Sequence, residues 1–279
     1  MQDFMEKQVN ALTQTIGFIG AGNMARAIAN GLIKASLVVP DQIILSDANP
    51  EQVVKLTEET GARGAANNNE LVDQSQIVIL STKPYHVADV CEQVRPQLKP
   101  GHLFISICAG VKTAKIEAAL GSAARVVRVM PNTPALIGCG SAAIAGGSHA
   151  TADDIETARR IFEAVGTAVV VAEDKLDLVT GLTGSGPAYL FRFIEALIQA
   201  GQQLGLSQEE AAALVPQMVL GSARMAIESG RSLQELREAV TTKGGTTEAG
   251  LKKLEEGNFM QLVQECVAAA TRRSAELAG

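Results

Sequence analysis

Three small residues near the start of the chain have the spacing of a phosphate-binding turn. Gly20, Gly22 and Ala25 form the pattern G-x-G-x-x-A directly after the β-branched run 15–19. In a strand–turn–helix context, the first glycine permits a tight turn, the second lets the backbone approach a pyrophosphate, and the alanine allows close helix–strand packing. Amides at the helix start then meet the phosphate charge. We therefore expect a dinucleotide site that includes Gly20, Gly22, Asn23 and Met24, the alternative being a tight turn without a ligand.

A carboxylate after the second predicted strand affects the choice between NAD and NADP as the cofactor. Asp47 comes directly after the run 42–46, and no arginine stands in the next three positions. A carboxylate at this place suits the ribose 2′-hydroxyl of NAD and repels the 2′-phosphate of NADP. We expect NADPH or NADH as the cofactor, with Asp47 favouring NADH. Alternatively, Asp47 only caps the turn before Pro50.

The elements that position these residues follow from the pattern of apolar residues. From residue 15 to about residue 172, short β-branched runs alternate with amphipathic segments of helical length. Strands are predicted at 15–19, 42–46, 76–81, 102–106, 125–130, 141–145 and 167–172, and helices at 26–34, 50–60, 85–95, 112–120 and 152–165. This alternation predicts a mostly parallel sheet with helices on both faces. Residues 1–172 are therefore assigned to an α/β Rossmann-type dinucleotide-binding domain, which begins with a polar leader at 1–13.

From Glu173 onward the pattern changes to helices alone, and residues 173–279 are assigned to an all-α C-terminal domain. Long helical segments are predicted at 186–204, 207–228, 233–240 and 259–277. Ser207 and Glu210 form a capping box, and Pro216 lies inside the same segment, where we expect a kink or a break. The helices carry Ala, Leu and Val on more than one face. This favours a subunit interface, the alternative being burial against the first domain.

Composition excludes several classes of function. The net charge of −6 and the absence of Trp argue against nucleic-acid binding. The longest uncharged stretch, 129–152, contains two prolines and four glycines, so no membrane span is expected. Four scattered cysteines and the lack of a signal peptide indicate reduced thiols in the cytoplasm. Three scattered histidines predict no metal site.

Four segments beyond the glycine loop carry the motifs of a known family. They are Ser-Thr-Lys-Pro at 81–84, Val-Met-Pro-Asn-Thr-Pro at 129–134, Leu-Thr-Gly-Ser-Gly-Pro-Ala-Tyr at 182–189, and Val-Thr-Thr-Lys-Gly-Gly-Thr-Thr-Glu-Ala-Gly-Leu at 240–251. From about residue 15 to its end, the chain resembles pyrroline-5-carboxylate reductase, the last enzyme of proline synthesis. The last segment is the most specific, because Gly-Gly-x-Thr in a helical domain has no general structural reason. Each of the others alone could form a turn or a cap.

The resemblance implies a role for each matching residue. At the nicotinamide end of the cofactor it places Thr82, Lys83, Pro84 and Ala109, and near the adenosine ribose it places Asn68. At the substrate it places Thr242, Gly245, Thr246 and Thr247, with Glu173 close by. The chain departs from the family pattern at Lys243, where Pro is usual, and at Asp47, where many members have Ser or Asn. The implied partners are the small-molecule substrate and a second copy of the chain, joined through the helical domain.

The implied substrate is a five-membered cyclic imine with one carboxylate, which needs an anion cradle and a hydrogen bond to its nitrogen. Residues 244–247 lie where a helix is predicted to start, so free amides there can hold the carboxylate without an arginine. An ordinary helix start is the alternative. Thr247 is the expected catalytic residue, hydrogen-bonded to the ring nitrogen while hydride passes to the imine carbon and gives L-proline. A protonated imine is already electrophilic, so orientation and water exclusion suffice.

Two rival functions remain open. A β-hydroxyacid dehydrogenase has the same layout but needs a lysine on the long interdomain helix, where 189–204 offers Arg192 and Glu195 but no lysine. A nucleotide-sensing module without turnover is the rival from another class. The intact Gly-Gly-Thr-Thr at 244–247 argues against that module.

Overall fold

The computed structural model describes residues 11–121 and 123–277, so most of the predicted leader at 1–13 lies outside the described residues. The chain forms two compact units: the described residues of Met1–Gly184 with those of Ala270–Gly279, and Ser185–Ala269. The sequence predicted a division at residue 173, whereas the structure keeps residues 173–184 with the first unit. The reason is that Leu176 is buried in an apolar cluster with Ala143 and Ala145.

The first unit is built on an eight-stranded sheet with the order β3-β2-β1-β4-β5-β6-β7-β8. The strands are β1 (Ile16–Ile19), β2 (Ile43–Ser46), β3 (Arg63–Gly64), β4 (Ile77–Leu80), β5 (Leu103–Ser106), β6 (Arg125–Met130), β7 (Gly140–Gly146) and β8 (Gly166–Val170). Every neighbouring pair is parallel except β6 and β7. The predicted α/β Rossmann-type fold with a mostly parallel sheet is confirmed. The two-residue strand β3 was not predicted, because two residues carry no periodic pattern.

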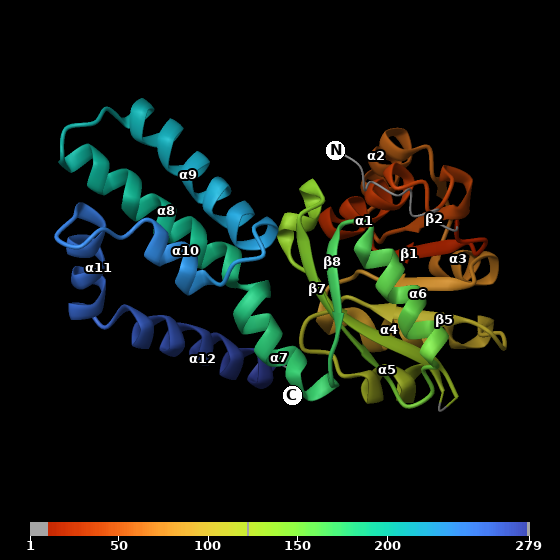
Figure 1. The fold of residues 1–279 in the computed structure, drawn as a ribbon. Helices are drawn as coiled ribbons and strands as arrows, with labels where there is room; N and C mark the ends of the chain where they lie inside the picture. The colour runs from red at the N-terminus through yellow and green to blue at the C-terminus, as the bar shows by residue number, and fades with distance from the viewer. Residues whose placement is uncertain (1–10, 122, 278–279) are drawn as a thin grey trace. The chain divides into compact units, whose positions relative to one another are not determined.

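Helices cover both faces of this sheet, as predicted (Figure 1). They are α1 (Asn23–Lys34), α2 (Pro50–Thr60), α3 (Asn68–Gln74), α4 (Val87–Val94), α5 (Thr113–Leu120) and α6 (Ala152–Glu163). Successive strand residues alternate between two buried clusters. Phe18 belongs to the cluster that contains Ile28 of α1, whereas Ile19 belongs to the cluster that contains Leu71 of α3 and Ile116 of α5. This two-sided burial explains why the strands are continuous apolar runs.

The first unit also contains short 3₁₀ helices between its longer elements. Two further short helices precede the second unit in the sequence. The 3₁₀ turns are η1 (Pro40–Gln42), η2 (Pro84–His86), η3 (Arg95–Gln97), η4 (Thr133–Ile137) and η5 (Glu173–Lys175). After η5 come α7 (Leu176–Val179) and a π-helix, η6 (Thr180–Gly184). Single-turn π-helices are rare and occur frequently at functional sites.

The second unit contains only helices among its described residues: α8 (Gly186–Gln203), α9 (Gln208–Glu228), α10 (Leu233–Ala239), α11 (Thr246–Glu256) and most of α12 (Phe259–Leu277). The capping box of Ser207 and Glu210 is confirmed at the start of α9. The predicted break at Pro216 is wrong, since α9 continues through it. The proline frees only the carbonyl of Ala212, an exposed residue, so that carbonyl can bond to water. No helix in the described parts of the chain is long and apolar enough to cross a membrane.

Candidate functional site

A large cleft lies in the first unit, where the carboxyl ends of the parallel strands meet. It has a volume of about 1180 Å³, and its wall includes residues that follow β1, β2, β4, β5 and β6. Eight predicted cofactor residues line it, namely Gly20, Gly22, Asn23, Met24, Asp47, Asn68, Thr82 and Lys83. Pro84, the first residue of η2, and Ala109 are outside the lining. The structure therefore gathers residues from widely separated motifs into one cavity, as ligand sites at this edge of an open sheet require.

The glycine turn has the backbone geometry that a pyrophosphate needs. Gly20 has φ +107°, and a Cβ there would lie 2.6 Å from Ser81 O, so no other residue fits without strain. Ser81 Oγ donates a hydrogen bond to Gly20 O at 2.7 Å and holds the turn against the end of β4. A Cβ on Gly22 would meet nothing within 4 Å, so the backbone is open to a ligand on that side.

The start of α1 provides unpaired donors next to this open space. Gly22 is the N-cap of α1, and the first turn carries no acidic residue. Within the described residues, the amides of Asn23 and Met24 have no hydrogen-bond acceptor. Unpaired amides and the positive end of the helix dipole favour an anion at this place. The residues present therefore fit the pyrophosphate of a dinucleotide.

Asp47 caps the turn before Pro50, one of the two roles that the sequence left open, and it also lines the cleft. Its Oδ2 accepts a hydrogen bond from Ala21 N at 2.7 Å and its Oδ1 accepts one from Asn49 N at 2.8 Å. The carboxylate thus caps the turn before Pro50 and also ties that turn to the glycine loop. Each carboxylate oxygen still has capacity for a further donor.

Asn68 is held in place by two residues that sequence reasoning did not single out. Its Oδ1 accepts a hydrogen bond from Ser46 Oγ at 2.8 Å, and its Nδ2 donates to Gln93 Oε1 at 2.9 Å. All three residues line the cleft. Ser46 was visible in the sequence as a polar residue that ends an apolar strand, whereas nothing in the sequence marks Gln93 on α4.

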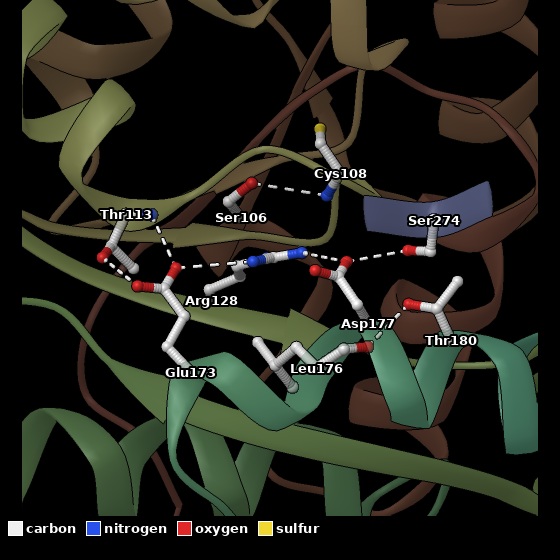
Figure 2. Close-up of polar contacts among 9 residues, drawn as sticks. All are labelled: Ser106, Cys108, Thr113, Arg128, Glu173, Leu176, Asp177, Thr180 and Ser274. Atoms are coloured by element: carbon white, nitrogen blue, oxygen red, sulfur yellow. Dashed lines mark hydrogen bonds and ion pairs between the residues drawn. The ribbon is translucent and has the colours of Figure 1, made fainter. Parts of the chain in front are cut away.

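A buried thiol shapes the loop after β4. Cys108 Sγ, with one hydrogen to donate, lies 3.2 Å from Thr82 O and 3.4 Å from Leu80 O. Cys108 N donates to Ser106 Oγ at 3.3 Å, the contact drawn in Figure 2. Burial raises the pKa of the Cys108 thiol, which keeps it protonated and able to donate. Cys108 therefore supports the backbone at Thr82.

The structure places Glu173 in a charge cluster around the buried Arg128 of the first unit (Figure 2). Its Oε1 accepts from Thr113 N at 2.7 Å and its Oε2 from Thr113 Oγ1 at 2.8 Å, while Arg128 Nη1 lies 3.5 Å from Oε1. The Arg128 side chain is only 3% exposed, and its Nη2 also lies 3.8 Å from Asp177 Oδ1. Ser274, near the end of α12, donates to that same oxygen at 2.8 Å. Glu173 does not line the cleft, and both of its carboxylate oxygens accept hydrogen bonds from Thr113.

The predicted substrate loop lies in the second unit and begins a helix, as expected. Gly244 has φ +74°, and a Cβ on Gly245 would lie 2.9 Å from Thr242 O, so both glycines are needed for the turn. Gly245 is the N-cap of α11. Gly244 N donates to Glu248 Oε2 at 2.7 Å. The amides of Thr246 and Thr247 have no acceptor within the described residues, so they are free to bind an anion.

Comparisons with known proteins agree over about 95% of the chain. Residues 173–277 match the family model for pyrroline-5-carboxylate reductase dimerisation, and residues 15–110 match the model for NADP oxidoreductases that depend on coenzyme F420. The pyrroline-5-carboxylate reductase of Pseudomonas aeruginosa is 42% identical over 267 residues, which cover 95% of this chain and 97% of that protein. Pyrroline-5-carboxylate reductase 2 of Bacillus subtilis is 38% identical over 263 residues, 94% of each.

Solved structures give the same result for the fold. A pyrroline-5-carboxylate reductase from Coxiella burnetii superposes with a TM-score of 0.92 at 39% identity, covering 96% of this chain and 100% of that one. Pyrroline carboxylate reductase of Plasmodium falciparum, solved with NADP bound, superposes with a TM-score of 0.85 at 32% identity, with coverage of 96% and 100%.

Proposed function

We propose a mechanism for this chain from one premise: the chain belongs to the pyrroline-5-carboxylate reductase family. It is an oxidoreductase that reduces 1-pyrroline-5-carboxylate to L-proline, the final step of proline synthesis, with a reduced nicotinamide dinucleotide as hydride donor. The observation that carries this conclusion is the 42% identity over 95% of the chain. The geometry of the glycine turn and of the loop at 244–247 supports it.

The residues of the cleft are proposed to hold the dinucleotide along the edge of the sheet. The amides that start α1, from Gly22 to Met24, hold the pyrophosphate, and Asp47 and Asn68 hold the adenosine ribose. Thr82, Lys83, Pro84 and Ala109 are assigned to the nicotinamide end. When bound, the dihydronicotinamide supplies a hydride. The protein's part is to fix the cofactor in one orientation and to exclude water.

The loop at the start of α11 is proposed to hold the substrate. The free amides of Thr246 and Thr247 bind the carboxylate, with Thr242 and Gly245 shaping the turn behind them. The Thr247 hydroxyl is assigned the hydrogen bond to the ring nitrogen. No side chain has to act as a strong acid, because the protonated imine is already electrophilic. Glu173, whose oxygens are bonded to Thr113 and Arg128, is assigned to ordering the first unit beside the substrate end.

Three finer points belong to the same proposal: the subunit interface, the preferred cofactor and the location in the cell. The dimerisation model supports a homo-oligomer, and we assign its interface to the exposed apolar faces of the helical unit, with each site completed near that interface. Asp47 is assigned a preference for NADH. A cytoplasmic location stays a prediction, supported by free thiols at Cys91, Cys108, Cys139 and Cys266.

A single assay tests the function and the cofactor together. The purified chain is mixed with 1-pyrroline-5-carboxylate and either NADH or NADPH, and absorbance is followed at 340 nm. We expect oxidation of both cofactors, faster with NADH, with proline as the product. Binding of NADH without oxidation would instead identify a nucleotide-sensing module. Turnover with a β-hydroxy acid and NAD, but none with the imine, would identify a β-hydroxyacid dehydrogenase.

A further inference from the structure

A buried amide side chain lies in the loop that follows β6. Asn132 is 9% exposed, and both ends of its side-chain amide have partners. Its Oδ1 accepts a hydrogen bond from Ser141 N at 2.9 Å, and its Nδ2 donates to Ser141 Oγ at 2.9 Å and to Thr183 O at 3.1 Å. The two amide hydrogens are thus divided between β7 and a carbonyl 51 positions along the chain. Only an amide of this length can make this set of contacts.

The carbonyl that Asn132 holds belongs to the π-helix η6. Thr183 is the last residue but one of η6, where helix carbonyls have no partner within the helix. The final residue, Gly184, lines the cleft together with residues 130–133. A Cβ on Gly184 would lie 2.7 Å from the Met130 methyl carbon, so the two segments pack directly on each other. Asn132 therefore joins the two segments that form this part of the cleft wall.

The order of the strands identifies which end of the cleft this wall encloses. Asp47 follows β2, Gly20 follows β1, and Met130 ends β6, while the sheet order is β2-β1-β4-β5-β6. A dinucleotide with its pyrophosphate at the start of α1 and its adenosine ribose near Asp47 extends from β1 toward β5 and β6. The wall formed by residues 130–133 and Gly184 lies at the nicotinamide end.

We infer that Asn132 is a positioning residue for hydride transfer: by holding the Thr183 carbonyl, it fixes the wall against which the nicotinamide ring is oriented. The inference rests on the proposed function. Because hydride transfer requires the reacting carbon atoms to be aligned closely, a shift of this wall lowers the rate of the chemical step. The adenosine end, which lies at β1 and β2, keeps its affinity.

The sharpest probe is Asn132→Asp, which has nearly the same size. It keeps an oxygen to accept from Ser141 N, but it places a second oxygen opposite the Thr183 carbonyl in a buried position, where the two repel each other. The matched control is Ser141→Ala, which removes the other acceptor of Nδ2 and leaves the Thr183 contact intact. Asn132→Ala is a second variant that keeps the test open if the aspartate variant does not fold.

Three measurements distinguish positioning from general loss of structure. We expect kcat for imine reduction to fall about 10- to 100-fold in Asn132→Asp. We also expect a larger kinetic isotope effect with NADH deuterated at C4, since hydride transfer becomes slower than the other steps. The Kd for ADP-ribose, which lacks the nicotinamide, should stay within about twofold of wild type, and Ser141→Ala should keep kcat within about threefold.

Each outcome has one meaning. The inference is overturned if folded Asn132→Asp or Asn132→Ala keeps the wild-type kcat and isotope effect. It is also overturned if ADP-ribose binding weakens as much as kcat falls, since Asn132 then supports the cleft as a whole. An inactive wild-type chain would instead refute the proposed function, and the two failures are therefore distinct.

Discussion

The two units of this chain differ in how far their large apolar side chains are buried. In the first unit, large side chains such as Phe18, Phe104 and Phe162 are fully buried in clusters on the two faces of the sheet. In the second unit, Ala211 is the one fully buried hydrophobic residue among those described. Many large side chains there are exposed, including Leu190, Phe191, Leu204, Leu214, Met218, Leu220, Met225, Ile227, Met260 and Leu262.

The polar groups of the two candidate sites differ in the same way. Around the cleft, the part-buried Ser81 and the buried Cys108 and Asn132 hold the backbone through side-chain hydrogen bonds. In the loop before α11 the useful groups are backbone amides at an exposed helix start. The polar side chains that support the cleft belong to the first unit itself, whereas the second unit leaves large apolar side chains exposed, as surfaces that bind another protein do.

The largest effect is expected where a charge enters an apolar face of the second unit. Phe191 on α8 is 60% exposed in the single chain, which fits a side chain that a second copy covers. We expect Phe191→Glu to weaken association by roughly 100-fold or more, because an uncompensated charge in a closed interface costs about 3 kcal/mol or more. Light scattering should then detect monomers, and the activity should be lost with the dimer.

The matched control places the same charge on the first unit. Val54 on α2 is 54% exposed, and Val54→Glu should leave both assembly and activity unchanged. If Phe191→Glu remains an active oligomer, or if the wild-type chain is an active monomer at low micromolar concentration, the contrast between the units does not reflect assembly.

The next effect tests whether the loop before α11 acts through a hydroxyl as well as through its amides. Thr247→Val keeps the β-branched shape and removes the group proposed to bond the imine nitrogen. We expect kcat/KM for the imine to fall about 10- to 100-fold, because a hydrogen bond to a charged partner is lost. The Kd for NADH should not change, since the glycine turn is untouched.

Thr246→Val is the control for this substitution. Its proposed contribution is the backbone amide, which the change leaves in place, so kcat/KM should fall less than in Thr247→Val. Equal losses in the two variants would show that the hydroxyl of Thr247 is not the nitrogen partner.

A smaller effect concerns cofactor choice in the first unit. Asp47→Ser removes the carboxylate that repels a 2′-phosphate, so the KM for NADPH should fall while the KM for NADH stays equal or rises. The expected change in preference is about tenfold, equivalent to 1–2 kcal/mol. Steady-state kinetics with both cofactors measures it. An unchanged ratio of the two KM values would mean that Asp47 only accepts hydrogen bonds from Ala21 and Asn49 and does not affect cofactor choice.

The smallest effect is a pH dependence of stability that belongs to the first unit alone. Burial, followed by the charge of Lys99, lowers the pKa of His102 below its ordinary value of 6.5. The folded protein therefore favours neutral His102. This stabilisation is complete above about pH 6.5 and is lost as the pH falls through the lowered pKa.

Thermal unfolding between pH 8 and pH 5 measures this contribution. We expect His102 to account for at most about 3 °C of the decrease in Tm. His102→Gln should lack that part of the decrease. His149 is exposed, so His149→Gln should keep the wild-type dependence. The same decrease in wild type and in His102→Gln would assign the acid sensitivity to other groups.

The sequence predicted the elements of this fold where they carry long periodic patterns. The strands 125–130 and 77–80, and the helices 50–60 and 259–277, lie within a residue or so of their predicted bounds. Helix α3 was missed, because its seven residues begin in a run of three asparagines that reads as a loop. Its start depends on Asn67, whose Oδ1 accepts from Glu70 N at 3.0 Å.

The candidate site was predictable to the extent that its groups are local. The glycine turn, the position of Asp47 after β2, and the helix start at 244–247 all depend on neighbours within a few residues. The role of Asn132 was not predictable, because its partner Thr183 is 51 positions away. The contacts of Glu173 with Thr113 and Arg128 join residues 60 and 45 positions apart, and no local pattern marks such pairs.

By itself, then, the sequence determined the alternation of strands and helices, the turn that fits a pyrophosphate, and the free amides before α11. These features depend on side-chain periodicity and on the backbone freedom of glycine, which act over one or two turns of chain. Only the tertiary structure decided that residues 173–184 pack with the sheet, that Asp47 holds the glycine loop, and that Asn132 holds Thr183. Those contacts exist because the packing of the sheet brings distant segments within hydrogen-bond distance, and a one-dimensional pattern carries no record of that pairing.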